Sequence, residues 1–348
     1  MKISFKNDYS EGAHPAILEA LLQTNRQQQP GYGLDDYSEQ AKALIRERIG
    51  NPQAEIFFVI TAGAGGTEAN LLVLGHVLRP HESIIACQSA HIADHETGAI
   101  EAVGHKIHLA PSDNGKLTPE QIRDYASRYT NVPHQVQPRL VYITQATEIG
   151  TLYSLAELKA IWQCCQELGL LLYMDGARLA QALSAEWNDI DWEDLARYTD
   201  IFYIGATKCG ALLGEAIVFN QAALAEYFGF YIKQKGALLA KGRLLGLQFL
   251  TLFQNNLYEE LGRVANTQMK RINEAFVAKG IGFLSDTCTN QLFPILTERQ
   301  IAQLSADFDF YLWQKVDAEY TAIRLITSWA TEDSQVEALL RVIEGLTP

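Results

Sequence analysis

The sequence predicts an α/β fold, in which helices cover both faces of a mostly parallel central sheet, with a smaller α+β domain in the C-terminal part of the chain. Up to about residue 250, short apolar runs rich in strand-forming residues alternate with helical patterns, and strands separated by helices usually form a parallel sheet. From about residue 258 that alternation stops. The 348 residues also exceed what one hydrophobic core usually supports.

The large domain is predicted from apolar strands that end in glycine or polar residues. These strands are residues 56–61, 83–87, 106–109, 140–144, 170–174, 200–204 and 216–219. Helical spacing of apolar residues lies between them, at residues 67–78, 93–102, 119–128, 155–168 and 192–198. In such a sheet, ligands bind outside the carboxyl ends of the strands. We therefore expect functional residues in the turns that follow the strands.

The remaining elements predict the smaller domain. A long helix at 258–279 precedes short strands at 282–284 and 291–296, a helix near 305–313, a strand at 322–328 and a helix at 335–345. We expect a large domain at residues 1–250, which carries these turns, and a small α+β domain at residues 251–348. The N-terminal arm, residues 1–30, contains one helix and can pack with the small domain.

Composition limits the partners of the protein. The formal net charge is −13, with 28 basic and 41 acidic residues, and such a surface repels nucleic acid and anionic lipid. No apolar run has the length of a membrane span or a signal peptide. Five scattered cysteines without a paired framework indicate reduced thiols and a cytoplasmic location. No metal site is expected, and the partners are expected to be small molecules.

A glycine-rich segment, residues 62–70, follows the first predicted strand. Glycines let the backbone approach an anion, Thr67 offers a hydroxyl group, and the start of the next helix presents free N–H groups. The segment is therefore a candidate phosphate cradle, although a tight strand-to-helix turn is an equal alternative. Its spacing matches neither a P-loop nor a dinucleotide-binding fingerprint.

Two charged residues end apolar strands. Asp175 is followed by Gly176 and Ala177, and a buried carboxylate there can bind a metal or a protonated ring nitrogen, unless it caps the next helix. Lys208 lies between small residues. A confined lysine loses proton affinity and can act as an amine nucleophile. The alternative for Lys208 is a side chain that extends to solvent.

His91 follows the strand at residues 83–87, with Glu96 shortly after it. Its imidazole can stack on a planar ring or move protons, or it can be a hydrogen-bonded loop residue. The four positions together supply a phosphate cradle, a carboxylate, an amine and a stacking ring. Pyridoxal phosphate (PLP) needs these groups, because it is an electron sink whose pyridine must stay protonated. The sequence therefore predicts a PLP enzyme.

The order of these groups resembles the aspartate-aminotransferase-like fold of PLP enzymes and, more narrowly, the threonine aldolases among the β-eliminating lyases. The matching motifs are Gly66-Thr67-Glu68-Ala69-Asn70, Ala90-His91-Ile92, Met174-Asp175-Gly176-Ala177-Arg178 and Thr207-Lys208-Cys209-Gly210. The bacterial low-specificity subgroup is matched by residues 143–150, by Gly214-Glu215-Ala216-Ile217 and by Arg324 ahead of Thr327-Ser328-Trp329. The similarity covers almost the whole chain.

The resemblance implies how the cofactor is held. Lys208 would bind the PLP aldehyde covalently, Asp175 would hold the pyridinium nitrogen and His91 would stack on the ring. The phosphate would be held mainly by backbone groups of the glycine-rich segment. The expected cofactor-binding residues are Gly66, Thr67, Glu68, His91, Asp175, Arg178, Thr207, Lys208 and Arg243.

The resemblance also implies substrate contacts. Arg178 and Arg324 would bind the substrate carboxylate, for which a guanidinium group has the right geometry. Asn7 or Asp8 would reach the substrate from the N-terminal arm, and His134 would lie near its hydroxyl group. The expected catalytic residues are Lys208, His91, Asp175 and His134, with His91 or His134 as the base. Family members are tetramers, built as dimers of dimers, with active sites at the contacts between subunits. Tyr32 is expected to bind the substrate, and Tyr32 and Arg243 are expected to make contacts from the neighbouring chain.

The implied reaction is the PLP-dependent cleavage of L-threonine or L-allo-threonine into glycine and an aldehyde. Thr207 stands where many relatives have serine, and residues 144–147 replace a common Glu-Asn-Thr-His segment, which leaves the stereochemical preference open. Another PLP-dependent β-eliminating lyase or an aminotransferase is the nearest alternative. A non-catalytic relative is less favoured because Lys208 and Asp175 are both present. A dinucleotide-binding enzyme would carry a different glycine pattern.

Overall fold

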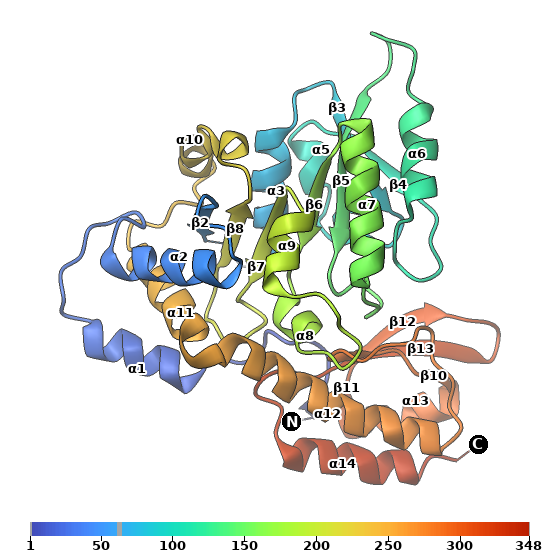
Figure 1. Cartoon of the computed structure of the whole chain (residues 1–348). Helices are drawn as coiled ribbons and strands as arrows, with labels where there is room; N and C mark the ends of the chain where they lie inside the picture. Colours follow the sequence, from blue (N-terminus) through green and yellow to red (C-terminus); the bar gives the residue numbers. More distant parts are fainter. Residues whose placement is uncertain (1, 61–64, 348) are drawn as a thin grey trace.

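A seven-stranded sheet forms the centre of the larger part of the molecule. The computed structural model describes residues 2–60 and 65–347. The strands of this sheet are β2 (Glu55–Val59), β3 (Glu82–Cys87), β4 (Ile107–Ala110), β5 (Gln137–Thr144), β6 (Leu171–Asp175), β7 (Ile201–Gly205) and β8 (Glu215–Phe219). Their order is β2-β8-β7-β6-β5-β3-β4 (Figure 1). Only β8 runs antiparallel to its neighbours β2 and β7, so the prediction of a mostly parallel sheet is confirmed.

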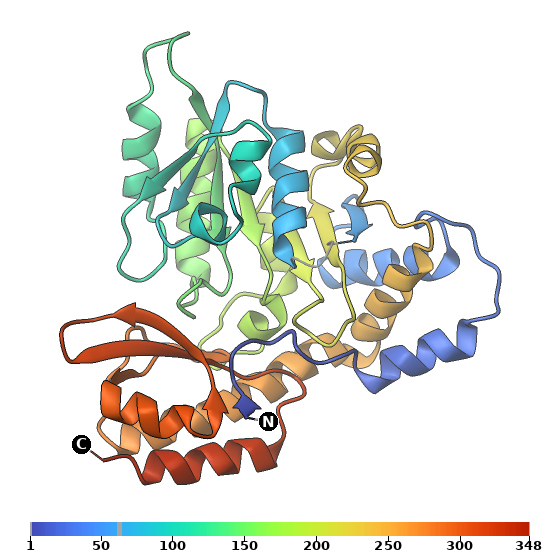
Figure 2. The ribbon, with the colours of Figure 1, turned by 180° about the vertical axis from the view of Figure 1, so that it is seen from behind.

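Helices cover both faces of this sheet. They are α3 (Gly66–Val77), α4 (His91–Asp94), α5 (Ala99–Ala102), α6 (Pro119–Ser127), α7 (Leu155–Leu168), α8 (Leu179–Leu183), α9 (Trp192–Tyr198) and α10 (Phe228–Gln234). Figure 1 shows α7 and α9 in front of the sheet, and Figure 2 shows α3 and α5 in front of its other face. The ends of α7 follow from its sequence. Ser154 and Glu157 form a capping box, and Gly169 takes the left-handed conformation after the last turn.

The N-terminal residues contact both parts of the molecule. The short strand β1 (Ile3–Ser4) pairs with β11 (Phe308–Asp309), far along the chain. The helices α1 (Pro15–Thr24) and α2 (Asp36–Arg48) instead pack on α11 (Arg243–Phe253). The arm therefore begins beside the C-terminal elements and then crosses to the larger part (Figure 2).

The C-terminal elements form a second, antiparallel sheet. The long helix α12 (Leu257–Ala278) leads to β9 (Gln291–Leu292), β10 (Ile295–Thr297), α13 (Glu298–Ser305), β12 (Tyr311–Lys315), β13 (Tyr320–Ile326) and α14 (Asp333–Glu344). Strand β13 pairs with β9, β10 and β12. Apolar side chains of α12, α14 and this sheet form their own hydrophobic cluster, separate from the cluster around the seven-stranded sheet. Where the chain divides into domains stays a prediction.

Four predicted elements differ from the structure. The strand expected at 282–284 is reduced to a single β-bridge between Phe283 and Pro294. The helix expected near 305–313 is wrong, because that segment contains the strands β11 and β12. The helix expected at 93–102 is broken between α4 and α5, where Thr97 and Gly98 have φ angles of 54° and 72°. The strand expected at 291–296 is interrupted at Phe293, before Pro294, a residue that has no N–H group to donate. The end of the first predicted strand, Thr61, lies outside the described residues.

The two sheets enclose the region where function is expected. The carboxyl ends of the parallel strands point toward the small sheet, which lies below them in Figure 1. Within residues 2–60 and 65–347, no helix has the length and apolar character needed to span a bilayer.

Candidate active site

A pocket of about 590 Å³ lies between the carboxyl ends of β6 and β7 and the small sheet. Its lining comes from both parts of the molecule: Tyr9, His91, His95, Glu148, Arg178, Lys208, Tyr311, Leu312, Trp313 and Arg324. Four residues predicted from the sequence, His91, Arg178, Lys208 and Arg324, are therefore brought together. The pocket lies where an open α/β sheet is expected to bind its ligand.

Lys208 lies in the turn after β7. Burial, and then the charge of Arg178, lower the pKa of the Lys208 amine, so the neutral nucleophilic form is more abundant than for a lysine in water. The turn is held by Glu215 of β8, which accepts hydrogen bonds from the Ala206 N–H group at 2.7 Å and the Thr207 hydroxyl at 2.8 Å. Thr207 is thus a support for the turn that carries the lysine.

Asp175, the last residue of β6, is surrounded by hydrogen-bond donors. Its carboxylate accepts from the hydroxyls of Tyr142 and Tyr203, each at 2.5 Å, from the Asn70 amide at 3.1 Å and from the Ala177 N–H group at 2.9 Å. Burial, and then the nearby Asp175 charge, raise the pKa of both tyrosines well above the ordinary value. They therefore remain donors. This set fixes a buried carboxylate that can pair with a protonated pyridine.

Asn70 of α3 links Asp175 to His91. Its amide nitrogen also donates to Glu96 at 2.7 Å, and its oxygen accepts from the Tyr173 hydroxyl at 2.9 Å. Glu96 in turn lies 2.8 Å from Nδ1 of His91. Burial alone would lower the pKa of His91, but the hydrogen bond with Glu96 and the charge of Glu148 outweigh it, so the pKa is raised. The imidazole is therefore fixed in orientation and favours its protonated form.

The predicted phosphate cradle lies at the start of α3. Gly65 precedes the helix with a φ of 57° and provides no capping side chain, so the first N–H groups, at Gly66, Thr67 and Glu68, have no side-chain cap. A Cβ atom on Gly66 would lie 2.0 Å from the Tyr203 hydroxyl, so only glycine fits there. Residues 62–64 of the predicted cradle lie outside the described residues. The amine, the supported carboxylate and this helix start fit the groups that PLP requires.

Arg178 is already paired within the protein. Its Nε and one terminal nitrogen contact the two oxygens of Asp8 at 2.7 and 3.1 Å, and Asn290 donates to the same carboxylate at 3.0 Å. Burial would raise the pKa of Asp8, but the charges of Arg178 and Lys208 and these hydrogen bonds lower it. Asp8 is fully buried and positions Arg178, and its contact with a substrate stays a prediction. Asn7 accepts from the Tyr9 N–H group and does not line the pocket.

Arg324 of β13 has a different environment. Its guanidinium lies 5.0 Å from the ring centre of Tyr311 and 4.6 Å from that of Trp313. Its Nε has no hydrogen-bond partner among the described residues. Burial, and then the charge of Arg178, lower its pKa. Arg324 is thus a cation held by aromatic rings and open to an anionic ligand.

Three further predicted residues, His134, Arg243 and Tyr32, do not line the pocket. His134 is in the loop before β5, at the amino end of that strand, whereas the pocket is at the carboxyl ends. Within one chain His134 does not line the pocket, and its predicted place near the substrate hydroxyl stays a prediction. Arg243 donates to the carbonyls of Thr24 and Gln27, and Tyr32 lies under the Lys233 ammonium. Contacts of Tyr32 and Arg243 with a neighbouring chain stay predictions.

Several lining residues were not predicted as site residues. Glu148 follows the carboxyl end of β5, so the rule that located Asp175 also applies to it. Tyr311 and Trp313 are two positions apart on β12 and both face Arg324. Side chains two positions apart lie on the same face of a strand, but this spacing was not recognised because the segment was predicted to be a helix. Tyr9 and His95 carry no local signal that distinguishes them from other loop residues.

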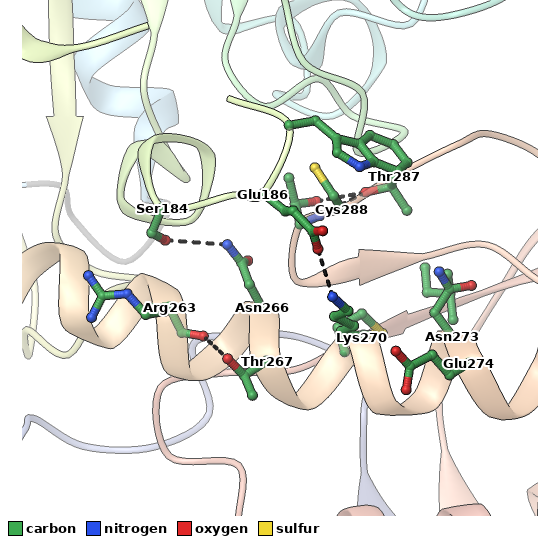
Figure 3. A pocket seen from close by; sticks show the side chains of 14 residues that line it. Ser184, Glu186, Arg263, Asn266, Thr267, Lys270, Asn273, Glu274, Thr287 and Cys288 are labelled. Carbon is green, nitrogen blue, oxygen red and sulfur yellow. Dashed lines mark hydrogen bonds and ion pairs between the residues drawn. The ribbon is translucent and has the colours of Figure 1, made fainter. Parts of the chain in front are cut away.

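A second hollow, of about 480 Å³, lies between α12 and the segments 184–187 and 287–289 (Figure 3). Glu186 and Lys270 form an ion pair of 2.7 Å at it, and Asn266 contacts Ser184 at 3.3 Å (Figure 3). None of the predicted site residues lines this hollow. The pocket at Lys208 is therefore the candidate active site.

Comparison with known proteins shows which proteins this chain is similar to. The family model for beta-eliminating lyases matches residues 6–297. The low specificity L-threonine aldolase of Pseudomonas aeruginosa is 34% identical over 346 residues, covering 97% of this chain and 96% of that protein. The solved structure of a threonine aldolase from Leishmania major has a TM-score of 0.95 and 44% identity, covering 99% of both chains.

A more distant structure tests the fold alone. A mutant aspartate aminotransferase from Thermus thermophilus is 12% identical, with a TM-score of 0.72 over 99% of this chain and 91% of that chain. The aspartate-aminotransferase-like fold predicted from the sequence is therefore confirmed.

Proposed function

The chain belongs to the beta-eliminating lyase family, and we propose that it uses PLP to cleave L-threonine, L-allo-threonine and related β-hydroxy-α-amino acids into glycine and an aldehyde. One observation carries the proposal: an amine with a lowered pKa, Lys208, lines the same pocket as the open guanidinium of Arg324. The amine suits the aldehyde of PLP, and the guanidinium suits an amino-acid carboxylate. The similar proteins from Pseudomonas aeruginosa and Leishmania major carry the threonine aldolase name.

The residues that would hold PLP occupy one side of the pocket. Lys208 binds its aldehyde, Asp175 its ring nitrogen, and the start of α3 its phosphate, while His91 lies against the ring. When bound, PLP supplies an electron sink for the pair of electrons released when the substrate bond breaks. The donors around Asp175 hold its carboxylate in one orientation, from which it can accept a hydrogen bond from a protonated ring nitrogen.

The opposite side of the pocket binds and orients the substrate. Arg324 takes the α-carboxylate with its fork of N–H groups. Arg178, held in place by Asp8, adds positive charge but has part of its own fork occupied. The side chain of the substrate then points toward the remaining lining residues, which must accept a proton from its hydroxyl group.

The protein acts in the cytoplasm as a homotetramer, a dimer of dimers, with small-molecule substrates and neither nucleic acid nor membrane as partner. All five cysteines are free, as in a reducing compartment. Tyr227 and Phe230, at the start of α10, are 69% and 77% exposed in the single chain, and such apolar surface is typical of a subunit contact. Tyr32 and Arg243 act across that contact.

The test uses the purified protein. Absorbance of lysine-bound PLP in the visible range, together with acetaldehyde and glycine from L-threonine or L-allo-threonine, is the expected result. The ratio of the two rates would give the stereochemical preference. A yellow protein that releases ammonia and a keto acid would instead be a β-eliminating lyase, and one that transfers the amino group an aminotransferase. A colourless protein that PLP cannot reconstitute would contradict the proposal.

A Lys208→Ala variant tests the central residue. Turnover of threonine should be abolished, because no other amine lines the pocket in the part of the chain that the structure describes. Normal steady-state turnover in this variant would refute the proposed role of the lysine.

A further inference from the structure

We propose that Glu148 is the catalytic residue that accepts the proton of the substrate's β-hydroxyl group. This inference rests on the proposed function, since only a β-hydroxy amino acid presents such a proton. It assigns to a carboxylate the role that the sequence had led us to expect of a histidine.

The position of Glu148 is the first argument. It lies in the turn after β5 and lines the pocket together with Lys208, His91 and Arg324. Of the carboxylates in the described part of the chain, it is the only one that lines this pocket. Its exposed fraction is 7%, so bulk water has little access to it. Behind it lies a cavity of about 10 Å³, which has room for about one water molecule.

The carboxylate of Glu148 has no hydrogen-bond or ion-pair partner among the described residues. The other buried carboxylates at the site have partners: Asp8 contacts Arg178, Glu96 contacts His91, and Glu215 holds the Lys208 turn. In contrast, Glu148 makes no hydrogen bond or ion pair with any residue in the described ranges. A buried carboxylate costs free energy unless it is paired. Positive charge on Arg178, Arg324 and His91 offsets part of that cost at a distance, and leaves the oxygens open to a ligand.

The turn that carries Glu148 is held in place from two sides. Gln145 makes two hydrogen bonds with the Tyr153 backbone, at 2.9 and 3.1 Å. From the other side, Gln291, Ser285 and Thr287 donate to the carbonyls of Thr147, Ile149 and Gly150 at 3.2, 2.6 and 2.8 Å, respectively. The residues on both sides of Glu148 are therefore held between the two sheets. A base held in this way needs no reorganisation during the reaction.

The other groups that line the pocket suit the role less well. Nδ1 of His91 is occupied by its contact with Glu96, and this contact raises the pKa of the imidazole, so a smaller fraction of it than of a free imidazole is able to accept a proton. Burial raises the pKa of Tyr9, which stays a neutral phenol. Arg178 and Arg324 are cations. His95, whose ring lies 5.6 Å from that of His91, is the one competing base, and the experiment below includes it.

The proton transfer completes the reaction as follows. Glu148 takes the hydroxyl proton, the freed electron pair on oxygen forms the carbonyl of the aldehyde, and the Cα–Cβ bond breaks. The glycine half keeps the electrons of that bond and gains one proton at Cα. Atoms and charge balance, since threonine yields acetaldehyde and glycine without an oxidant or a further reactant.

The test is the Glu148→Gln holoenzyme, measured in three ways. Threonine cleavage should fall by about 10²- to 10⁴-fold, the usual contribution of a general base. Exchange of the glycine α-proton in deuterated water, followed by NMR, needs no hydroxyl base and should be nearly unchanged. Threonine should still bind, as shown by its change of the visible absorbance, and should accumulate uncleaved.

Two control variants separate this role from others. Thr151→Val removes a hydroxyl contact of 2.7 Å at the base of the same turn and leaves the carboxylate in place, so the ratio of cleavage to exchange should stay that of the wild type. The same loss of cleavage relative to exchange in Thr151→Val would show that Glu148 acts only through the turn. His95→Asn should also keep the wild-type ratio, and loss of cleavage alone in His95→Asn would assign the base to His95.

Other outcomes would overturn either the inference alone or the proposed function as well. A Glu148→Gln protein that cleaves threonine at the wild-type rate, or loses exchange and cleavage equally, overturns the inference while the proposed function stands. A wild-type holoenzyme that exchanges the glycine proton but cleaves neither threonine isomer overturns the proposed function, and the inference with it.

Discussion

The two sides of the pocket differ in how their charged groups are satisfied. On the side of the seven-stranded sheet, Asp175 accepts four hydrogen bonds, and Asn70 joins it to Glu96 and His91. On the side that faces the small sheet, Arg324 lies against aromatic rings with its Nε unpaired. On the side of the seven-stranded sheet, hydrogen bonds hold the charged groups in place before a ligand binds. On the side of the small sheet, the charge of Arg324 stays available to a ligand.

Because of this difference, we expect one side of the pocket to contribute mainly to folding stability and the other mainly to ligand binding. Removing a paired buried group leaves its partners unsatisfied and costs folding free energy. Removing an unpaired buried charge costs the fold little, because the charge was itself unfavourable there, but it removes a ligand contact. Variants on the sheet side should therefore lower stability, and variants on the open side should lower activity.

Among the variants that compare the two sides of the pocket, Arg324→Leu is expected to have the largest effect. Loss of a charged hydrogen bond to the substrate carboxylate should lower kcat/KM for threonine by roughly 10- to 150-fold, while the free energy of unfolding stays equal or rises. Steady-state kinetics and urea unfolding measure the two quantities. Arg324→Lys is the matched control, which keeps the charge and loses the fork. A clear fall in stability would contradict the division between the two sides.

Next comes Asn70→Leu on the sheet side. Three groups lose a hydrogen-bond partner, so the free energy of unfolding of the holoenzyme should fall by about 2 kcal/mol, and PLP should bind more weakly. Urea unfolding and the visible absorbance at increasing PLP concentrations measure these effects. Tyr173→Phe removes only the contact to the amide oxygen and should cost less. Unchanged stability in Asn70→Leu would show that Asp175, Glu96 and Tyr173 do not depend on Asn70 as a common partner.

A pH effect is expected from Glu215. Burial raises its pKa from 4.5 to about 7, so between these values the folded protein binds more protons than the unfolded chain. Stability must then fall as the pH rises through this window. We expect a fall of the order of 1 kcal/mol between pH 5.5 and 7.5 in the wild type, measured by urea unfolding. The fall should be absent in Glu215→Gln; an equal fall in both proteins would point to another group.

The smallest effect is expected from Trp313→Leu. Loss of the ring beside the Arg324 guanidinium should raise KM for threonine by about 2- to 5-fold, as for a cation–π contact of about 0.5–1 kcal/mol. Kinetics on threonine measure it, with Trp187→Leu, at a residue outside the pocket, as the control. An effect of Trp313→Leu as large as that of Arg324→Leu would mean that the tryptophan itself binds substrate.

The sequence predicted the sheet side of the site better than the open side. Asp175 and Lys208 end strands whose apolar character is evident, so their meeting at one edge follows from the parallel sheet. The aromatic support of Arg324 belongs to β12, which was predicted as helix, because short edge strands lack a strong periodic signal. The position of His134 at the amino end of β5 could not be predicted, because motif spacing does not tell which end of a strand a loop residue occupies. The domain boundary after residue 250 stays a prediction.

The pairing of β1 with β11 has a consequence for the biosynthesis of the protein. Residue 3 finds its strand partner only at residue 308, and Asp8, the partner of Arg178, lies just after that strand. The ribosome must therefore make most of the chain before the arm can dock. Such distant contacts form slowly. Until the arm docks, Arg178 lacks its ion pair with Asp8, and the pocket is completed among the last steps of folding.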